Sequence, residues 1–476
     1  MQPIRDHARR PHQPGRCRPP RRPYRPLLER LELRLAPANV DVLRYHNDLS
    51  LSGANLGEET LTLANVNPTQ FGKLFSQPVD GYVYAEPLYK ANLAIPGQGT
   101  HNVAFVATEH DSVYAFDADS PTGGPDPMHP GQLWFHSFLD QQNGVTTVPS
   151  PSVVSNSDIV PEIGITGTPV IDGSTNTLYV VAKTLEVRSG VQHYVQKLHA
   201  LDITTGNERP APYTIADTIL GGPEGGWTNV SDISVNGVGD ADAVGGVVRF
   251  NAARENNRAA LQIVNGVVYV AWSSHSDFRP YHGWVVGFNA QSLQPVKVFN
   301  TSANAAGNGM WQSGGAISAD VQGNLYFALG NGFPGPQGQD AFNPSLGNWS
   351  ESVLKLSATG QLTVADYFTP FEWRTLDSQD ADLGSGGVML LPDSVGSAAH
   401  PHLMVELGKS GKLYLIDRAN MGHNVPPPGP DNVVQVVTAG QRGVWGNPTF
   451  FQVNPTTGII YYHGSGDVMR GYTRAI

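Results

Sequence analysis

Three ionisable residues, Glu109, His110 and Asp111, stand together in this sequence and could bind a metal ion or a polar ligand. They separate two short runs that alternate apolar and polar residues, 103–108 and 112–116, which is typical of a β-hairpin. A hairpin tip usually carries residues such as Asn-Gly, and two carboxylates beside an imidazole repel or compete unless something compensates them. Ca²⁺ prefers oxygen ligands of this kind. The sequence therefore predicts Glu109 and Asp111 as metal ligands, or as residues just outside the ligand shell.

The same hairpin recurs, in degenerate form, along the whole chain. Its first strand is expected at 103–108, 177–183, 267–272, 324–329, 402–407 and 459–464. Its second strand is expected at 113–117, 198–202, 285–289, 353–357, 413–417 and 469–473. A strand-like run precedes each pair and another follows most pairs, with turns supplied by 53 glycines and 37 prolines. We therefore predict an all-β protein, a β-propeller of four-stranded blades with about six blades visible.

The spacing of the units bears on how the ring would close. The second strands end at unevenly spaced positions (117, 202, 289, 357, 417 and 473), which indicates long insertions in a constant core. A β-solenoid and a string of separate sandwiches rank below a propeller, because the coils are uneven and no linkers are obvious. The sixth unit ends at Ile476 after its third strand, and an unclosed ring would leave bare sheet edges. We expect residues 38–476 to be a propeller truncated from seven or eight blades. The alternative is six blades closed by residues 40–46.

Four-stranded blades determine which residues can meet. If the strands run outward from the axis, the second-to-third-strand turns and the connections between blades emerge on one face. The candidates for this face are Asp80, Glu109, His110, Asp111, Glu162, Arg258, His275, Asp277, His282, Gln312, Asp380, Asp382, Lys409 and Asp467, together with Trp311 and Trp445. Such residues would surround an axial pocket able to bind a polar ligand or Ca²⁺. Crowding could also raise the pKa of one carboxyl into the range of a general acid or base, although no catalytic residue is assigned.

Each candidate also has a purely structural interpretation. Aspartates such as Asp277 and Asp467 commonly stabilise turns. His275 and His282 lack a known metal-ligand spacing, which favours structural hydrogen bonds. Trp134 and Trp272 are expected to pack between blades. The prediction of a binding site therefore depends on the convergence of these residues and on the propeller itself.

Charge and composition exclude several classes of protein. Residues 1–36 hold ten arginines and three acidic residues, whereas the remainder holds 20 basic and 38 acidic residues. We expect the Pro- and Arg-rich head, residues 1–37, to be a disordered export segment, and the acidic body argues against nucleic acid as a partner. No apolar run is long enough to span a membrane. The single cysteine, Cys17, lies in the head, so the body has no disulfide and no thiol nucleophile.

Several motifs resemble known families. "LHALDITTGNERPAP" (198–212) resembles the blade signature of pyrroloquinoline-quinone (PQQ)-type propellers, in which an Ala-x-Asp-x-x-Thr-Gly segment precedes a strand bearing a docking tryptophan. Asp117 and Trp134 keep part of this signature around a long insert, and "LYLIDRANMG" (413–422) keeps only the aspartate. "FGKLFSQPVDGYVYAEPLY", "VATEHDSVYAFDAD", "GITGTPVID" and "DLGSGGVMLLPD" resemble exported bacterial propellers of undefined activity. "LLERLELRLAPA" (27–38) resembles a Leu-Glu-x-Leu-Glu-x-Arg segment of planctomycete surface proteins, although an ordinary amphipathic helix is the alternative.

These resemblances imply a protein of the cell surface or the extracellular space and leave two functions open. The first is non-catalytic binding of a small polar ligand, a glycan or a protein partner through the axial face. The absence of an adjacent cysteine pair and of a Cys-x-x-Cys-His haem motif favours this hypothesis. The second is a PQQ- and Ca²⁺-dependent oxidoreductase acting on an alcohol or a sugar. The resemblance assigns neither calcium ligands nor a catalytic base to particular residues.

Overall fold

The computed structural model describes residues 40–150, 158–220, 227–440 and 443–475, and almost all of its regular structure is β-strand. The predicted disordered head, residues 1–37, lies outside the described residues and stays a prediction. Within the described ranges the only α-helix is α2 (Trp373–Ser378). Short 3-10 helices are η1 (Gln141–Asn143), η2 (Gln312–Gly314), η3 (Pro344–Leu346), η4 (Leu383–Ser385) and η5 (Asp393–Val395).

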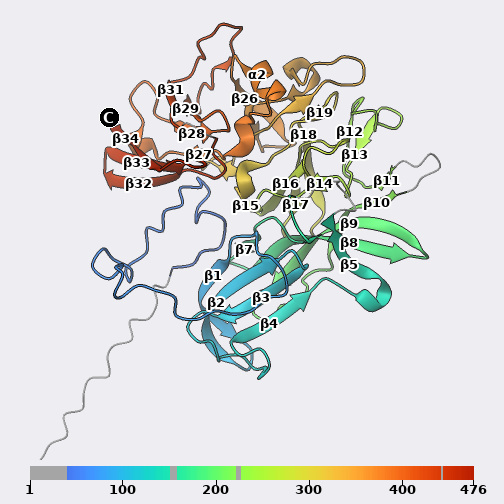
Figure 1. Cartoon of the computed structure of the whole chain (residues 1–476), viewed down its shortest axis with the longest axis vertical. Helices are drawn as coiled ribbons and strands as arrows, with labels where there is room; N and C mark the ends of the chain where they lie inside the picture. The colour runs from blue at the N-terminus through green and yellow to red at the C-terminus, as the bar shows by residue number, and fades with distance from the viewer. Residues whose placement is uncertain (1–39, 151–157, 221–226, 441–442, 476) are drawn as a thin grey trace, which may run out of the picture. The chain divides into compact units, whose positions relative to one another are not determined.

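Six sheets of three or more strands follow one another along the described chain, and Figure 1 shows them in order from blue to red. Sheet 1 holds β1 (Leu88–Ile95), β2 (Gly99–Thr108), β3 (Ser112–Asp117) and β4 (Gln132–Ser137). Sheet 2 is built on β7 (Val170–Asp172), β8 (Thr177–Arg188), β9 (Val191–Asp202) and β10 (Tyr213–Leu220). Sheet 3 is built on β15 (Gln262–Val264), β16 (Val267–Ser274), β17 (Trp284–Asn289) and β18 (Pro295–Asn300).

The remaining three sheets repeat this strand order. Sheet 4 is built on β20 (Ser318–Ala319), β21 (Leu325–Ala328), β25 (Val353–Ser357) and β26 (Thr363–Thr369). Sheet 5 holds β27 (Met389–Leu390), β28 (Leu403–Leu407), β29 (Lys412–Asp417) and β31 (Gln435–Thr438). Sheet 6 holds β32 (Thr449–Asn454), β33 (Thr457–His463) and β34 (Met469–Ala475). The second and third of these strands in every sheet are antiparallel and are the pairs that the sequence predicts.

Insertions decorate this core. Sheet 2 gains β5 (Val145–Pro149), β6 (Glu162–Ile163) and β11 (Trp227–Val230), sheet 3 gains β14 (Glu255–Asn256), and sheet 4 gains the parallel β30 (His423–Asn424). Three two-stranded sheets pair β12 (Ser234–Asn236) with β13 (Val247–Arg249), β19 (Ala306–Gly307) with β22 (Gly332–Phe333), and β23 (Phe342–Asn343) with β24 (Asn348–Trp349). These additions account for the uneven spacing of the repeats in the sequence.

Apolar side chains fill the space between each sheet and the next. Separate buried clusters join sheets 1 and 2, 2 and 3, 3 and 4, 4 and 5, and 5 and 6. Trp134 of β4 reaches sheet 2, where its indole N–H donates to the Ile203 carbonyl at 2.8 Å. Gly206 (φ 74°) leaves room for that indole, because a Cβ there would collide with the ring. Sheets stacked face to face in chain order are propeller blades, so the predicted all-β propeller class is confirmed.

The path of residues 42–52 shows that one prediction was wrong, namely that residues 40–46 close a ring of six blades. The segment 40–46 does not join sheet 6 to close the ring; it makes a single bridge, between Val42 and Tyr89 of β1. The chain then meets the first strand of every sheet in turn. The contacts are Val42 with Tyr89, Leu43 O with Ile171 N, Arg44 with Gln262, Leu49 O with Ala319 N, Ser50 O with Leu390 N, and Ser52 O with Phe450 N, each at 2.8–2.9 Å. This segment therefore connects the inner strands of all six sheets.

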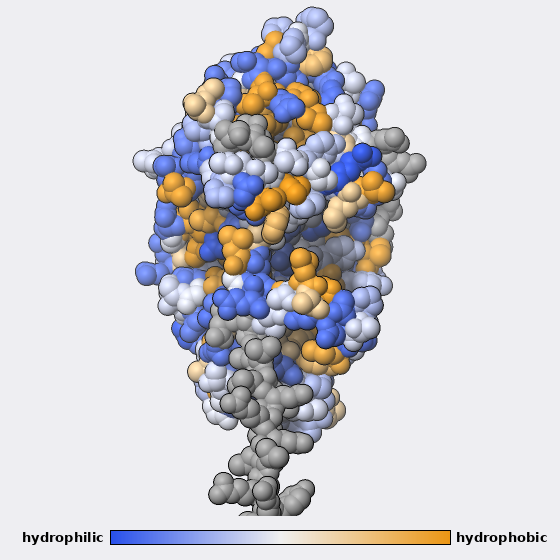
Figure 2. All heavy atoms as spheres, turned by 90° about the vertical axis from the view of Figure 1, so that its left-hand side faces the viewer, coloured by the Kyte–Doolittle hydropathy of each residue, from blue (hydrophilic) through white to orange (hydrophobic). Residues whose placement is uncertain are grey.

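The surface combines polar residues with separate apolar groups, as the face in Figure 2 shows. Phe451, Val453 and Met469 of sheet 6 are all exposed. Leu63 and Leu74, in the irregular region before β1, are also exposed. A search of the described residues finds no helix of the length and apolarity needed to cross a membrane.

Candidate functional site

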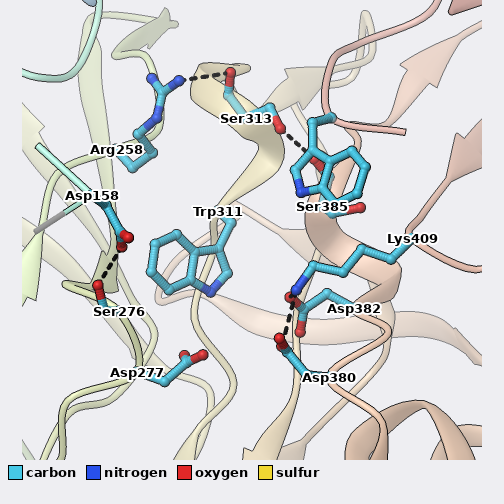
Figure 3. A pocket seen from close by; sticks show the side chains of 11 residues that line it. Asp158, Arg258, Ser276, Asp277, Trp311, Ser313, Asp380, Asp382, Ser385 and Lys409 are labelled. Atoms are coloured by element: carbon cyan, nitrogen blue, oxygen red, sulfur yellow. Dashed lines mark hydrogen bonds and ion pairs between the residues drawn. The ribbon is translucent and has the colours of Figure 1, made fainter. Parts of the chain in front are cut away.

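A cavity of about 610 Å³ lies where the connections between sheets meet the turns after the second strands, and we call it the axial cavity. Ser276 and Asp277 follow β16, and Lys409 follows β28; the other lining residues lie on connections that enter sheets 2 to 6. The lining consists of Asp158, Arg258, Ser276, Asp277, Trp311, Ser313, Asp380, Asp382, Ser385, Lys409 and Trp445, most of which are labelled in Figure 3. The volume is typical of a small-molecule site.

One side of the cavity is acidic. Lys409 Nζ lies 2.6 Å from Asp382 Oδ2 and 2.9 Å from Asp380 Oδ1. Burial lowers the pKa of Lys409, but the charges and hydrogen bonds of Asp382 and Asp380 outweigh it, so this pKa lies above its ordinary value. Asp277 accepts a hydrogen bond from the Tyr281 hydroxyl at 2.5 Å, and burial raises the pKa of Asp277 to about 6. This side therefore offers carboxylate acceptors with only one ammonium group among them.

Arg258 and Ser313 lie on the other side of Trp311 in Figure 3. The guanidinium of Arg258 donates to the Ser313 carbonyl at 3.2 Å. This carbonyl belongs to a tight turn in which Gln312, Ser313 and Gly314 all have positive φ (42°, 47° and 89°). Such a conformation is costly for residues other than glycine and often marks a functional site. The buried Gln312 holds the turn, because its amide donates to the Ala316 carbonyl at 2.9 Å and its Oε1 accepts from Ala328 N at 3.0 Å.

Two tryptophans supply the apolar part of the lining. Trp311 is half-buried, and Trp445 is exposed over 54% of its surface, so both present indole surface that a ligand can cover. Two serine hydroxyls connect the loops around them: Ser313 donates to the Ser385 carbonyl at 2.5 Å, and Ser385 donates to the Val444 carbonyl at 2.7 Å. The lining is thus tied together before any ligand binds, which lowers the entropic cost of binding.

The structure places five of the fourteen predicted binding-face residues in this cavity: Arg258, Asp277, Asp380, Asp382 and Lys409. A second group of five, Asp80, Glu109, His110, Asp111 and Glu162, lies instead where sheets 1 and 2 meet. Here Glu109 Oε2 accepts from Gly164 N at 2.8 Å, and His110 Nδ1 lies 2.9 Å from Glu162 Oε1. Asp80 accepts from Thr108 and Ser112 at 2.9 and 2.6 Å.

The sequence predicts that a bound cation offsets the charges of Glu109 and Asp111, but the structure offers another explanation. Both are fully buried, and within the described chain the Asp111 carboxyl accepts one hydrogen bond, from the Lys183 backbone amide at 3.2 Å. Burial raises the pKa of Glu109 to about 7 and that of Asp111 well above its ordinary value, so protonation can reduce their repulsion without a cation. No group of three His, Cys, Asp or Glu side chains in the described ranges is placed to hold a metal ion. The described residues therefore provide no set of ligands that would support the predicted Ca²⁺ site at Glu109 and Asp111.

The other predicted residues have structural partners outside the cavity. His275 Nε2 lies 2.8 Å from Lys183 Nζ, and His282 Nδ1 lies 2.9 Å from Ser302 Oγ. Gln312 holds the turn below Trp311, as described above, and Asp467 pairs with Arg470 at 2.9 Å. Burial lowers the pKa of Lys183 to about 7. Lys183 lies within β8 and not in a turn, so the pattern of turn residues in the sequence did not point to it.

Four lining residues carried too weak a signal to be found in the sequence. Ser276, Ser313 and Ser385 are common in any turn, and Asp158 lies in an insertion with no counterpart in the other units. Their positions follow from the packing of separate connections and not from a local pattern. The lining residues that the sequence pointed to are Trp311, Trp445 and the five charged residues other than Asp158.

Comparison with known proteins identifies the fold but not a family. No protein-family model matches the chain, and no curated protein matches it. Similar solved structures include the quinohemoprotein alcohol dehydrogenase ADHIIG from Pseudomonas putida HK5 (14% identity, TM-score 0.54, 90% of this chain and 60% of that one). They also include the quinohemoprotein alcohol dehydrogenase from Comamonas testosteroni (15%, 0.52, 90% and 58%) and a europium-containing methanol dehydrogenase (13%, 0.51, 91% and 73%).

At these identities the likeness shows the fold alone: a β-propeller of the kind found in quinoprotein alcohol dehydrogenases. The chain spans about 60% of the length of the first structure and 58% of the second. The activity of those enzymes is therefore not transferred to this chain by their similarity.

Proposed function

We propose that this protein is an exported or cell-surface β-propeller that binds a carbohydrate in the axial cavity without converting it. The observation that carries the proposal is the pairing of two accessible tryptophans with carboxylates and serines around one cavity of about 610 Å³. Location outside the cell rests on the sequence resemblances described above. The fold is compatible with binding as well as with catalysis.

The lining matches the two surfaces of a sugar ring. The flat apolar face of a pyranose can pack on an indole, and Trp311 stands between the acidic side and Arg258. The hydroxyls at the ring edge can donate to Asp277, Asp380 and Asp382, and hydrogen bonds to ionised carboxylates are stronger than neutral ones. The hydroxyls of Ser276 and Ser385 donate to Asp158 and to the Val444 carbonyl, so their oxygens add further acceptors. Binding thus combines covered aromatic surface with several oriented acceptors.

A quinone-dependent oxidoreductase is the second candidate, and the fold likeness is the observation that favours it. The residues of the cavity fit pyrroloquinoline quinone poorly, because this molecule carries three carboxylates. Four aspartates line the cavity against two cations, and Lys409 is already paired with two of those aspartates. The described residues also lack a three-residue metal-ligand group. Repulsion between like charges would therefore oppose binding of the quinone.

Isothermal titration calorimetry of the purified protein with neutral and acidic oligosaccharides tests the proposal, because it measures affinity without depending on the emission of Trp311. Trp311→Ala should weaken binding about tenfold or more through loss of the aromatic contact. Trp227→Ala is the matched control, since Trp227 lies on β11 outside the cavity, and it should leave affinity unchanged.

Equal binding by wild type and Trp311→Ala would place the sugar elsewhere and contradict the proposal. Mixing the protein with pyrroloquinoline quinone and Ca²⁺ tests the second candidate. A bound chromophore together with dye-linked oxidation of an alcohol or a sugar would favour the oxidoreductase over the binding protein.

A further inference from the structure

Arg258 differs from the other cation of the axial cavity in having no carboxylate partner. Among the described residues, its guanidinium donates a single hydrogen bond, to the Ser313 carbonyl, and no carboxylate lies within ion-pair distance of it. Lys409, in contrast, is held by both Asp380 and Asp382. Arg258 is half-buried, so water solvates its charge only in part. A cation in this position is stabilised when an anion approaches it.

The surrounding backbone makes room for this guanidinium. Gly314 is in the left-handed conformation (φ 89°), and a Cβ at that position would collide with a guanidinium nitrogen of Arg258. The phenols of Tyr45 and Tyr84 and the carboxyl of Glu109 act electrostatically on Arg258, and burial raises the pKa of Glu109 to about 7. Glu109 therefore supplies only a partial countercharge near neutral pH. The guanidinium is held in place but left without an ionic partner.

The charges of the cavity are separated along its length. Figure 3 shows Arg258 and Ser313 above Trp311, Asp158 beside it with a hydrogen bond from Ser276, and Asp277, Asp380 and Asp382 below it. A ligand that complements both ends carries a negative group at one end and hydrogen-bond donors at the other. The planar guanidinium fork matches a carboxylate, which it can bind through two parallel hydrogen bonds.

We propose that the ligand is an acidic carbohydrate that contains a uronic acid residue. Arg258 binds the carboxylate, Trp311 packs on the ring, and Asp277 and Asp380 accept hydrogen bonds from the hydroxyls. The inference rests on the proposed function, because it names the sugar class that the same cavity selects. It makes Arg258 the residue that distinguishes acidic from neutral sugars.

The test compares, by isothermal titration calorimetry, a trisaccharide with a single uronic acid residue and its methyl ester, two probes that differ in one charge. The wild type should bind the acid at least about tenfold more tightly than the ester, because esterification removes the one charge that pairs with Arg258. Arg258→Gln should bind both probes with equal affinity. Arg374→Gln is the matched control; Arg374 is an exposed arginine on α2 that pairs with Asp340, and its loss should leave the preference intact.

Each outcome is decisive. Equal affinity of the wild type for acid and ester would overturn the acidic-sugar inference while leaving carbohydrate binding in place. Failure of both probes and of neutral oligosaccharides to bind would remove the proposed function together with the inference. The comparison of two probes on the wild type needs no variant, so it decides the question even if Arg258→Gln fails to fold. A preference that persists in a folded Arg258→Gln would assign the selectivity to another residue.

Discussion

Burial affects the protonation of several carboxyl groups in this propeller more than neighbouring charges do. Asp277 is the clearest case in the axial cavity, because burial raises its pKa to about 6 although the Tyr281 hydroxyl and Lys409 act in the opposite direction. Glu109, Asp111, Glu351 and Glu406 share the effect, and burial is the largest cause for each. A sequence shows which side chains are acidic, but it does not show how much water each one loses on folding. The charge state of this site was therefore not predictable from sequence.

The raised pKa of Asp277 predicts a pH-dependent effect of replacing it. The folded protein binds this proton more tightly than the unfolded chain, so the contribution of Asp277 to stability is present below pH 4 and is lost as the pH rises towards 6. Asp277→Asn removes the titration and keeps the acceptor for Tyr281. The melting temperature of Asp277→Asn relative to wild type should rise by roughly 2–4 °C between pH 4 and pH 7. A difference that stays constant over this interval would contradict the raised pKa.

Replacing Glu406 with an apolar residue should stabilise the protein. It lies on β28 opposite Tyr414, and both of its carboxyl oxygens are buried without a hydrogen-bond partner among the described atoms. Glu406→Met keeps a similar volume and removes the unpartnered groups, so it should stabilise the fold by about 1–2 kcal/mol at pH 8. The gain should shrink at pH 4, where the unfolded chain also holds the proton.

Urea unfolding of Glu406→Met and wild type measures this difference. Glu186→Met serves as the contrasting variant, because Glu186 is buried but paired with Lys197 at 2.8 Å and with Arg188. Its loss should destabilise the protein, since Lys197 loses its carboxylate partner and Arg188 keeps only Asp217. A Glu406→Met protein less stable than wild type at pH 8 would mean that the carboxyl has a partner, such as buried water.

Secondary-structure elements divide into those fixed by local pattern and those fixed by distant contacts. The six strand pairs were predictable, because each strand shows its own alternation of apolar and polar residues and is bounded by turn residues. The path of residues 42–52 was not, because its partners extend from Tyr89 to Phe450. The local pattern of residues 40–46 is that of a strand, and nothing in it reveals that the segment would cross all six sheets instead of completing one.

This segment predicts an unequal effect of two neighbouring leucines. Leu51 is fully buried against Ala260 and Ala316, whereas Leu56 is 86% exposed. Leu51→Ala should cost about 2–4 kcal/mol, because it opens a cavity at the segment that joins the inner strands. Leu56→Ala, the matched control, should change stability by less than about 0.5 kcal/mol. Equal small effects in chemical denaturation would show that residues 42–52 contribute little to holding the sheets together.

At the scale of the whole molecule, the convergence of connections on one face was predictable from the propeller, but the contents of the cavity were not. The sequence pointed to fourteen binding-face residues, and the fold brings five of them to the axial cavity while placing Glu109 and Asp111 in the packing between sheets 1 and 2. A second cavity, of about 560 Å³, lies between sheets 4 and 5 and is lined by Lys355 and Arg418 among others. Trp311 lines the axial cavity and not the second one, so the titration of Trp311→Ala distinguishes the two.

An experimental structure of the protein bound to its tightest oligosaccharide from the titrations is the most direct test of the central claim. We predict a sugar ring packed on Trp311 in the axial cavity, with its hydroxyls hydrogen-bonded to Asp277 or Asp380 and an acidic group facing Arg258. A sugar bound in the cavity between sheets 4 and 5, or anywhere that leaves Trp311 uncovered, would contradict carbohydrate binding at this site.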